Sequence, residues 1–219
     1  MWVWFSHSLN PNTEGYEGKK SLVVQQKKSI FAGDSSNSIM FSMDNHLGTH
    51  VDAPFHFIKD GPRISDYKAC DWIFNSPVLI NKSLEPGELL TQESIDESLP
   101  EVDDADIVII KTGFEKYRGT NKYWELAPGY SSDLCNYFLN KFKSIKAIGF
   151  DSISLSSLKH REEGRIAHKE FLSNNIRIFE DLQLSTISSK SKLHSIVALP
   201  LVIDGSDGGP CTIIANISK

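Results

Sequence analysis

The segment that organises this chain is His46-Leu47-Gly48-Thr49-His50-Val51-Asp52-Ala53-Pro54-Phe55-His56. Three of the chain's seven histidines lie within it, and Asp52 lies among them. Apolar side chains such as Val51 and Phe55 flank these ionisable groups, and a polar cluster in apolar surroundings needs compensating partners. We therefore interpret the segment as a functional site and not as a run of ordinary surface histidines.

The spacing of the first two histidines constrains the local backbone. His46 and His50 are four residues apart, so one helical turn would bring them to the same face, whereas a straight strand would separate their Cα atoms by about 13 Å. A shared site therefore requires a turn, which Gly48 permits. Pro54 limits helix continuation and redirects the chain before His56.

These side chains suit a metal ion. Neutral imidazole and carboxylate are ligands for Zn²⁺ and, where more oxygen atoms are present, for Mn²⁺. Asp52 lies two residues beyond His50, so we expect His46, His50 and Asp52 to form a three-ligand face. His56 is expected near the ion without necessarily binding it.

His168 and Glu180 form a second, more distant candidate pair. Along one straight helix they would lie about 18 Å apart. The break at Asn174-Asn175 removes that objection, because a helix and a strand can fold back on each other there. From the residues alone, ion pairing or surface solvation is the simpler interpretation of this pair, and metal binding is the alternative.

The composition indicates an ordinary globular protein. The chain has 219 residues, 40% of them hydrophobic, and a net charge of −5. This length suits a single domain, residues 1–219. No basic patch indicates nucleic-acid binding, and the mixed charges of residues 159–165 are interpreted as solvated surface. The three cysteines lie far apart, and no signal peptide or membrane span is visible, so we expect a cytoplasmic protein.

The apolar runs are short and rich in β-branched residues, which is typical of strands. Asp204–Pro210 is a strong turn signal, so the last two strands form a hairpin or pair with other strands. Because strands outnumber helices and do not alternate with them regularly, we predict an α/β fold with a mixed, largely antiparallel sheet. The expected strands are 2–6, 21–25, 39–43, 77–80, 107–111, 147–150, 176–179, 196–201 and 212–215, and the expected helices begin at Asp133, near Lys159 and near Thr91.

The segment from His46 to His56 resembles the cyclase family, whose best-known members are bacterial kynurenine formamidases. It matches every fixed position of the family pattern HxGTHxDxPxH. Similar family blocks follow along nearly the whole chain: Lys111-Thr112-Gly113, Ile148-Gly149-Phe150-Asp151-Ser152, His168–Leu172 with Ile178–Leu182, and Ala198–Leu201 with Gly205–Pro210.

This resemblance implies a swivelling β/β/α fold and a homodimer or larger homo-oligomer. It implies that His46, His50 and Asp52 bind a metal ion and that His168 and Glu180 bind a second one in binuclear members. The expected cofactor is Zn²⁺, as one or two ions, or Mn²⁺. His56 carries over as the catalytic histidine. An aromatic N-terminus, Trp2, Trp4 and Phe5, is a candidate surface for the partner subunit.

We therefore expect metal-dependent hydrolysis of a small amide, with a metal-activated water and His56 as the general acid and base. Hydrolysis of a cyclic amide, imide or lactone is the alternative, and a non-catalytic metal-binding protein is the third. The N-terminal stretch Thr13–Gly18 departs from the family's Pro-rich stretch and leaves the substrate open. Candidate pocket aromatics, more simply explained as core or interface residues, are Trp2, Trp4, Phe57, Tyr67, Trp72 and Trp124.

A serine mechanism is not indicated. The chain has no GxSxG segment, and the serine pairs Ser156-Ser157 and Ser188-Ser189 lack a glycine frame. Both pairs are expected in loops.

Overall fold

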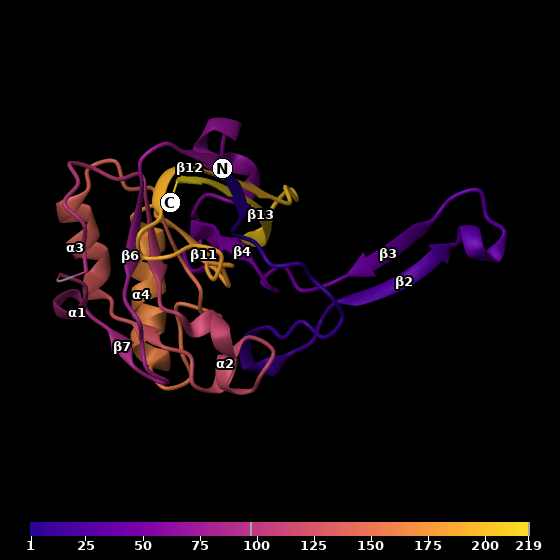
Figure 1. Cartoon of the computed structure of the whole chain (residues 1–219), viewed down its shortest axis with the longest axis horizontal. Coiled ribbons are helices and arrows are strands. Elements are labelled where there is room, and N and C mark those ends of the chain that lie inside the picture. Colours follow the sequence, from indigo (N-terminus) through magenta and orange to yellow (C-terminus); the bar gives the residue numbers. More distant parts are fainter. Residues whose placement is uncertain (97, 219) are drawn as a thin grey trace.

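A nine-stranded sheet forms the centre of the molecule, in the order β5-β12-β13-β4-β11-β10-β8-β6, and β1 pairs with β13 (Figure 1). The computed structural model describes residues 1–96 and 98–218. The strands of this sheet are β1 (Trp2–Trp4), β4 (His50–Asp52), β5 (Ile73–Phe74), β6 (Pro77–Asn81), β8 (Ile107–Lys111), β10 (Ala147–Phe150), β11 (Arg177–Glu180), β12 (Lys192–Pro200) and β13 (Gly208–Ser218).

The sheet has a parallel half and an antiparallel half. β6, β8, β10 and β11 are parallel. From β11 through β4, β13 and β12 to β5, every pairing is antiparallel. The end strand β6 also approaches β12, so the sheet curls into a nearly closed barrel. The predicted mixed α/β fold, with much antiparallel pairing, is confirmed.

Strand β8 shows why the apolar runs are continuous. Ile107 and Ile109 point into the interior of the curled sheet, where they meet side chains of β12 and β13. Val108 and Ile110 point to the other face, where they pack against the helices. A strand buried on both faces reads as an uninterrupted apolar run instead of an alternating one.

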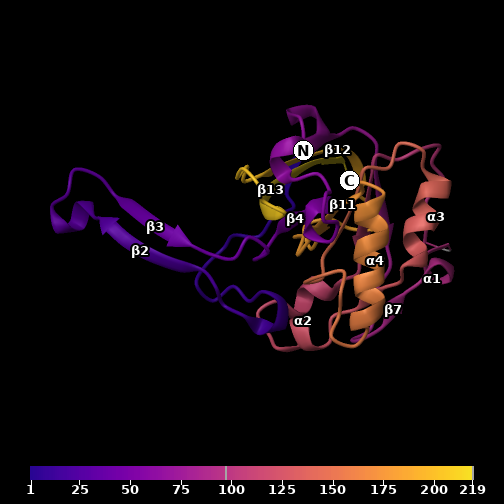
Figure 2. The ribbon, with the colours of Figure 1, turned by 180° about the vertical axis from the view of Figure 1, so that it is seen from behind.

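Two helices cover the outer face of the parallel half (Figure 2). They are α3 (Asp133–Lys141) and α4 (Arg161–Ser173), and both begin close to their predicted starts. The third predicted helix is α1 (Gln92–Asp96). Within residues 1–96 and 98–218, no helix combines the length and apolar character that crossing a membrane demands.

All nine predicted strands are present, seven of them with ends within three residues of the prediction. The last two are longer than predicted, since β12 begins four residues earlier and β13 extends four residues before and three residues beyond the predicted range. The elements that the periodicity did not reveal are short, because two to four residues carry too little pattern. They are β4, β5, β7 (Leu89–Leu90), β9 (Gly129–Tyr130) and α2 (Lys122–Glu125). Phe5, which was expected to contact a partner, is instead buried in the chain's own core.

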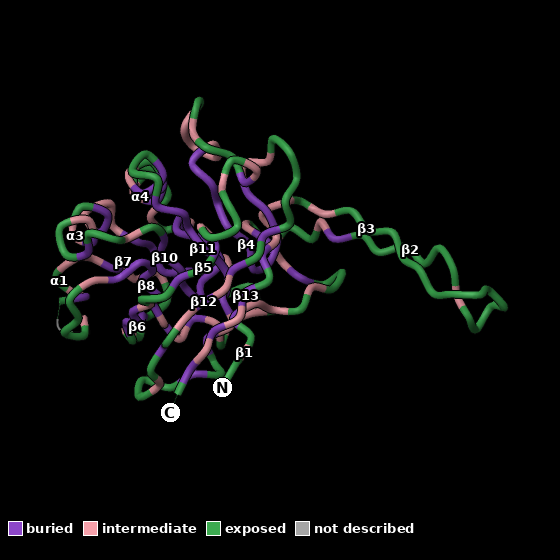
Figure 3. The backbone as a smooth tube through the Cα atoms, turned by 90° about the horizontal axis from the view of Figure 1, so that it is seen from above, coloured by how far each residue is buried: buried purple, intermediate pink, exposed green. Residues whose placement is uncertain are grey.

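A long hairpin projects away from the sheet (Figure 1). It contains β2 (Val23–Lys28), a 3-10 turn (Ile30–Ala32) and β3 (Ser38–Ser42). β2 and β3 form a separate two-stranded sheet, and both are exposed along their whole length (Figure 3). We call residues 21–43 the arm.

Candidate metal centre

The segment from His46 to Asp52 forms a turn followed by a strand. His46 lies in the turn, and His50 and Asp52 lie on β4. Gly48 has a φ of +70°, in the left-handed region that favours glycine, and a Cβ there would also overlap the Leu9 side chain. The predicted turn is present, but the backbone that follows it is extended and not helical.

Strand pairing places the candidate ligands side by side. His50 and Asp52 are two residues apart on β4, so their side chains lie on one face. In the pairings of β4, His50 is opposite Glu180 on β11, and Asp52 is opposite Gly208 on β13. A Cβ at Gly208 would lie 2.6 Å from His46 Cε1, so the close approach of β13 requires glycine.

Pro54 begins a helical turn, which differs from our expectation that it would end one. The 3-10 turn Pro54–His56 has proline at its start, where the missing N–H would have had no partner. This turn brings His56 to the site from another direction. Its ring centroid lies 4.2 Å from that of His46 and 6.3 Å from that of His168.

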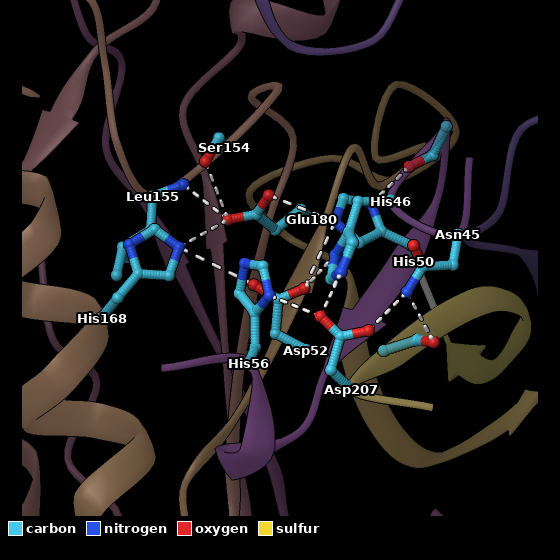
Figure 4. Close-up of polar contacts among 12 residues, drawn as sticks. Asn45, His46, His50, Asp52, His56, Ser154, Leu155, His168, Glu180 and Asp207 are labelled. Carbon is cyan, nitrogen blue, oxygen red and sulfur yellow. Dashed lines mark hydrogen bonds and ion pairs between the residues drawn. The ribbon is translucent and has the colours of Figure 1, made fainter. Parts of the chain in front are cut away.

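Asp52 lies at the centre of the cluster (Figure 4). Its Oδ1 is 2.8 Å from His46 Nδ1 and 3.4 Å from His50 Nε2, and its Oδ2 is 3.7 Å from His168 Nε2. Glu180 places Oε2 3.4 Å from His50 Nε2 and Oε1 3.5 Å from His168 Nε2. The structure thus brings the five predicted metal ligands together. His168 and Glu180 are buried, so surface solvation is excluded for this pair.

Two imidazoles are oriented with one nitrogen towards the carboxylates. His50 Nδ1 lies 2.8 Å from the carbonyl oxygen of Gly48, and His168 Nδ1 lies 2.7 Å from that of Gly164. A carbonyl oxygen only accepts, so each Nδ1 carries the proton and each Nε2 turns its lone pair towards Asp52 and Glu180 when the ring is neutral. A backbone carbonyl on the far nitrogen is the usual support of a metal-binding histidine.

The loop after β10 supports this cluster. Ser154 Oγ and the backbone N–H of Leu155 donate hydrogen bonds to Glu180 Oε1, at 3.2 Å and 2.7 Å. Ser156 Oγ lies 3.2 Å from His168 Nδ1. Ser156-Ser157 was expected in a loop and not as part of a serine mechanism. It does lie in a loop, but Ser154 and Ser156 orient the candidate ligands.

His56 is held by a carboxylate that the sequence reasoning quoted within a family block but did not assign. Asp207 Oδ2 lies 2.7 Å from His56 Nδ1 and 3.0 Å from His46 Nε2. Asn45 Nδ2 donates to Asp207 Oδ1 at 2.7 Å. The position of Asp207 in the signature Gly205–Pro210, directly before β13, was the signal that could have identified it.

Hydrogen bonds to Asp181 fix the end of β11. Asp181, which follows Glu180, has a φ of +53°, a strained value for a residue with a side chain. Its carboxylate accepts from the Arg118 guanidinium at 2.9 Å and from the Tyr123 hydroxyl at 2.5 Å. Its carbonyl oxygen accepts from Thr49 Oγ1 at 2.5 Å. These bonds hold the left-handed residue in place, as strained backbone at a functional site requires.

The carboxylates dominate the electrostatics of the cluster. Burial alone would lower the pKa of His46, but its hydrogen bonds to Asp207 and Asp52 outweigh burial and raise it to about 9. The pKa of His50 is also raised, by Asp52 and Glu180 against the effect of burial. Burial would raise the pKa of Asp52, and the imidazoles of His46 and His50 hold it well below its usual range. The carboxylates of Asp52, Glu180 and Asp207 are therefore stabilised by positive charge, either protons on the imidazoles or a bound cation.

The donor set fits a divalent metal. One donor atom from each of His50, Asp52 and Glu180 lies within 4.8 Å of the others, and the same is true of His46, Asp52 and His56. Asp52 belongs to both groups. Four of the N–O separations among the candidate ligands, from 3.4 to 3.7 Å, exceed the roughly 2.9 Å of an ordinary hydrogen bond. The lone pairs of these atoms therefore face a common space between them. Imidazole and carboxylate in this proportion suit Zn²⁺ or Mn²⁺.

The cluster lies at the base of a cavity of about 430 Å³. The candidate ligands His46, His50, Asp52, His168 and Glu180 line it, and so does His56. The other walls are mixed in character and come from the N-terminal loop, the 3-10 turn after β4, the loop after β10 and α4: Tyr16, Glu17, Phe57, Ile153, Ser154, Ser156, Arg161 and Arg165.

Most of the aromatic residues proposed for the pocket lie elsewhere, as the simpler reading expected. Phe57 alone of the six lines this cavity, and it stacks on His168 with ring centroids 4.6 Å apart. Trp72 is buried beneath Arg177, whereas Trp2 and Trp4 are exposed. Tyr16, which lines the cavity, belongs to the N-terminal stretch that departs from the family pattern.

The comparisons with known proteins agree with this geometry. The chain is 25% identical to kynurenine formamidase from Bacillus cereus over 209 aligned residues. The alignment covers 95% of this chain and 94% of that protein. Kynurenine formamidase from Bacillus cytotoxicus is 24% identical over 213 residues, or 97% and 96% of the two chains.

Solved structures share the fold. An isatin hydrolase bound to the product analogue thioisatinate has a TM-score of 0.81 at 21% identity, over 99% of this chain and 92% of its own. A protein described as a predicted metal-dependent hydrolase, from Bacillus stearothermophilus, has a TM-score of 0.77 at 20% identity, over 98% and 97%. The family model "Putative cyclase" matches residues 3–157, more than half of the sequence. This chain therefore belongs to the cyclase family.

Proposed function

We propose that this protein hydrolyses the amide bond of an N-formyl arylamine, as kynurenine formamidase does, with a divalent metal ion bound by His46, His50, Asp52, His168 and Glu180. The observation that carries this proposal is the convergence of three imidazoles, those of His46, His50 and His168, on the Asp52 carboxylate, with Glu180 beside two of them. This cluster lines a cavity that His56 also lines. A storage site has no need of an additional base beside its ligands.

The class of reaction does not depend on which substrate is used. The chain is a cyclase-family hydrolase that acts on carbon–nitrogen bonds other than peptide bonds, as predicted. The N-formyl arylamine is favoured because the similarity to kynurenine formamidases extends over nearly the whole of both chains. Zn²⁺ is favoured as the ion because three imidazoles accompany only two carboxylates among the proposed ligands.

The bound ion would polarise the formyl carbonyl and lower the pKa of a water molecule. Asp207 holds the Nδ1–H of His56 and thereby fixes the tautomer whose Nε2 is free to accept a proton. His56 takes a proton from the attacking water and returns it to the leaving nitrogen. The C–N bond breaks as oxygen adds to the formyl carbon, and formate and the free arylamine are released.

The cavity walls suit an anionic aromatic substrate. Tyr16, Phe57 and Ile153 offer apolar surface for an aryl ring. Arg165 follows Arg161 by four residues on α4, and His168 follows Arg165 by three. This spacing places all three side chains on one side of the helix. Both guanidinium groups line the cavity, and each is paired with a glutamate, Arg161 with Glu17 and Arg165 with Glu162, both at 2.7 Å. The carboxylate of a substrate such as N-formylkynurenine would take the place of these partners.

A substrate panel tests the proposal. Metal-free protein is reconstituted with Zn²⁺ or Mn²⁺ and assayed with N-formylkynurenine, isatin, a lactam and a cyclic imide. We expect metal-dependent hydrolysis with the largest kcat/KM for N-formylkynurenine. Activity confined to the cyclic compounds would favour the alternative ring-opening hydrolase. Full metal content without hydrolysis of any compound would favour a non-catalytic metal-binding protein.

The arginine stripe gives a separate test of substrate charge. The change Arg165→Met should raise KM for N-formylkynurenine about tenfold, because a charge-assisted hydrogen bond is lost at a partly exposed position. The KM for isatin, which has no carboxylate, should stay unchanged. Lys169→Met, on the same helix but outside the cavity lining, is the matched control. Equal effects of Arg165→Met on both substrates would contradict carboxylate recognition.

A further inference from the structure

An ion pair at the solvent end of the cavity links the N-terminal loop to α4. Glu17 Oε1 lies 2.7 Å from the guanidinium of Arg161, the first residue of α4, and both residues line the cavity. Their side chains are 38% and 43% exposed, whereas four of the five candidate ligands at the base are buried. Burial raises the pKa of the neighbouring Tyr16 hydroxyl, and the charge of Arg161 opposes this, so the guanidinium lies near Tyr16 as well.

The turn that carries Glu17 holds this residue in an unfavourable conformation. Glu17 has a φ of +60°, in the left-handed region that glycine adopts at a lower cost. The N–H of Gly15 donates to the Lys19 carbonyl oxygen, and the N–H of Gly18 donates to the Gly15 carbonyl oxygen. A Cβ at Gly18 would overlap the Trp124 indole, so the turn is seated closely on α2. Strained backbone is typical of functional sites, which points to a role for the Glu17 carboxylate.

The Glu17 carboxylate has two cationic partners that solvent reaches. Its hydrogen bonds to Arg161 and Lys19 lower its pKa, so the group is ionised at neutral pH. Lys19 Nζ lies 3.4 Å from Oε2, and the Lys19 side chain is 70% exposed. Ion pairs this exposed contribute little to stability, so a ligand that offers the same charges can replace either partner. Glu17 is therefore available to a cationic group that enters the cavity.

A ligand with an ammonium and a carboxylate on one carbon atom matches this pair. A simple carboxylate would displace Glu17 from Arg161 and leave the glutamate without its guanidinium partner. The head group of an α-amino acid compensates both side chains, because its ammonium donates to one and its carboxylate accepts from the other. Charges arranged in this way select a zwitterion over a simple anion.

The position of Arg161 on α4 suits a ligand that reacts at the base of the cavity. Arg161 precedes His168 by seven residues on the same side of the helix, or about 10 Å at 1.5 Å per residue. An aromatic ring with a short side chain bridges such a span. Tyr16, Phe57 and Ile153 line the same cavity and offer it apolar surface.

We propose that Glu17 and Arg161 form a subsite for an α-amino acid head group, and this inference rests on the proposed hydrolysis of an N-formyl arylamine. Glu17 accepts hydrogen bonds from the ammonium, and Arg161 donates to the carboxylate. When the ligand binds, the two side chains exchange their contact with each other for contacts with the ligand. Glu17 thereby distinguishes N-formyl arylamines that carry an amino acid from those that carry only a carboxylate.

Calorimetric titration with two stable ligands tests the subsite without turnover. Kynurenine, the arylamine product, is compared with an analogue that lacks only its α-amino group. Wild type should bind kynurenine about tenfold more tightly than the analogue, because one charge-assisted hydrogen bond distinguishes them. Glu17→Gln should bring this ratio close to one, since it removes the acceptor for the ammonium. A wild type that binds neither ligand or shows no preference, or an unchanged ratio in Glu17→Gln, would overturn the subsite.

Two further variants separate recognition from a change in the turn. Glu17→Asp keeps the charge on a residue that tolerates left-handed backbone, so it should retain part of the preference. Glu125→Gln removes an exposed carboxylate of α2 that does not line the cavity, and this matched control should bind as wild type does. Equal weakening of both ligands by Glu17→Gln would indicate a structural role and contradict the subsite.

Hydrolysis assays keep the subsite distinct from the proposed function. Glu17→Gln should raise KM for N-formylkynurenine about tenfold more than KM for N-formylanthranilate, which has a carboxylate but no ammonium. Equal changes for the two substrates would reject the subsite and leave the proposed function intact. If wild type hydrolyses neither substrate, the proposed function fails, and the ratio of the two binding constants still decides the subsite.

Discussion

The metal centre and the arm lie at opposite extremes of burial, although only three residues, Met43-Asp44-Asn45, separate β3 from His46. His50, Asp52, His168 and Glu180 are each at most 3% exposed. Every residue from Val23 to Ser42 except Ser29 is exposed, and many of these are apolar.

The two regions depart from the usual distribution of residues in opposite ways: one buries ionisable side chains, and the other exposes apolar ones. Buried ionisable groups are costly unless they are compensated, and exposed apolar surface is costly unless it is covered. In both regions the folded chain alone leaves the compensation incomplete. The comparison teaches that buried charge and exposed apolar surface are opposite departures, for which we expect a bound cation and a covering surface respectively, and each expectation can be tested separately.

The largest effect is expected from removing the Asp52 carboxylate, which the candidate ligands share. Asp52→Asn eliminates the negative charge that His46, His50 and His168 all face. We expect metal content to fall to trace levels and hydrolysis to fall to the uncatalysed rate. Elemental analysis and an amide hydrolysis assay on the same preparation measure both.

The control for this change is Asp204→Asn, an exposed aspartate in the connection between β12 and β13. It should keep both its metal and its activity. An Asp52→Asn protein that retains a full complement of metal would show that the cluster is compensated internally, by protonated histidines alone.

A smaller effect distinguishes His56 from the ligands. His56→Asn removes the proton-transfer group but leaves the five proposed ligands in place. We expect kcat to fall by about 10²–10⁴-fold, the usual contribution of a general base, with metal content unchanged. His194→Asn, at an exposed histidine of β12, is the control. If metal and activity are lost in parallel, His56 is a ligand, as its place in the second donor group allows.

The sequence predicted which residues meet in the candidate metal centre better than it predicted the geometry in which they meet. Spacing alone identified His46, His50 and Asp52, because three donors within seven residues must meet if the chain turns. It also required a turn at Gly48, which is present. The strand at β4 was missed, because a three-residue strand held between two neighbours is determined by its pairing and not by its own propensity.

Long-range partners were beyond reach from the residues alone. Asp207, Ser154 and Arg118 act on groups that lie from 26 to 151 residues away in sequence. The pairing of β4 with β11 and β13 brings them together, and periodicity does not specify pairing. The arm illustrates the same limit. Its two strands were predicted, but no local pattern indicated that they would leave the body of the molecule.

His7 provides a finer contrast, since it is an imidazole with little exposure outside the cluster. Burial lowers its pKa from the usual 6.5, although the charge of Asp181 opposes this. Near pH 6.5 the unfolded chain therefore binds a proton more readily than the folded chain. Stability from this group is complete above pH 6.5 and declines as the pH falls towards the folded pKa.

We expect His7→Gln to unfold in urea with a smaller loss of stability between pH 7.5 and pH 5.5 than wild type shows. The cluster histidines have the opposite shift, since carboxylates raise the pKa of His46 and His50. An identical loss in both proteins would show that His7 does not contribute to the pH dependence.

The smallest expected effect concerns the arm. If a second copy covers it, folding and association are linked, and the melting temperature depends on protein concentration. A tenfold rise in concentration adds about 1.4 kcal/mol to the stability of a dimer, and an unfolding entropy of about 2.1 cal/mol/K per residue converts this to about 1–2 °C. Differential scanning calorimetry between 1 and 100 μM should show this slope for wild type and for Val102→Asp, a change at an exposed position outside the arm, and none for Phe41→Asp. Because the five proposed metal ligands come from a single chain, saturation with metal should raise all three curves without changing their slopes. A wild-type melting temperature that does not change with concentration would show that the arm has no role in assembly. The exposed apolar ribbon would then need a partner other than this chain.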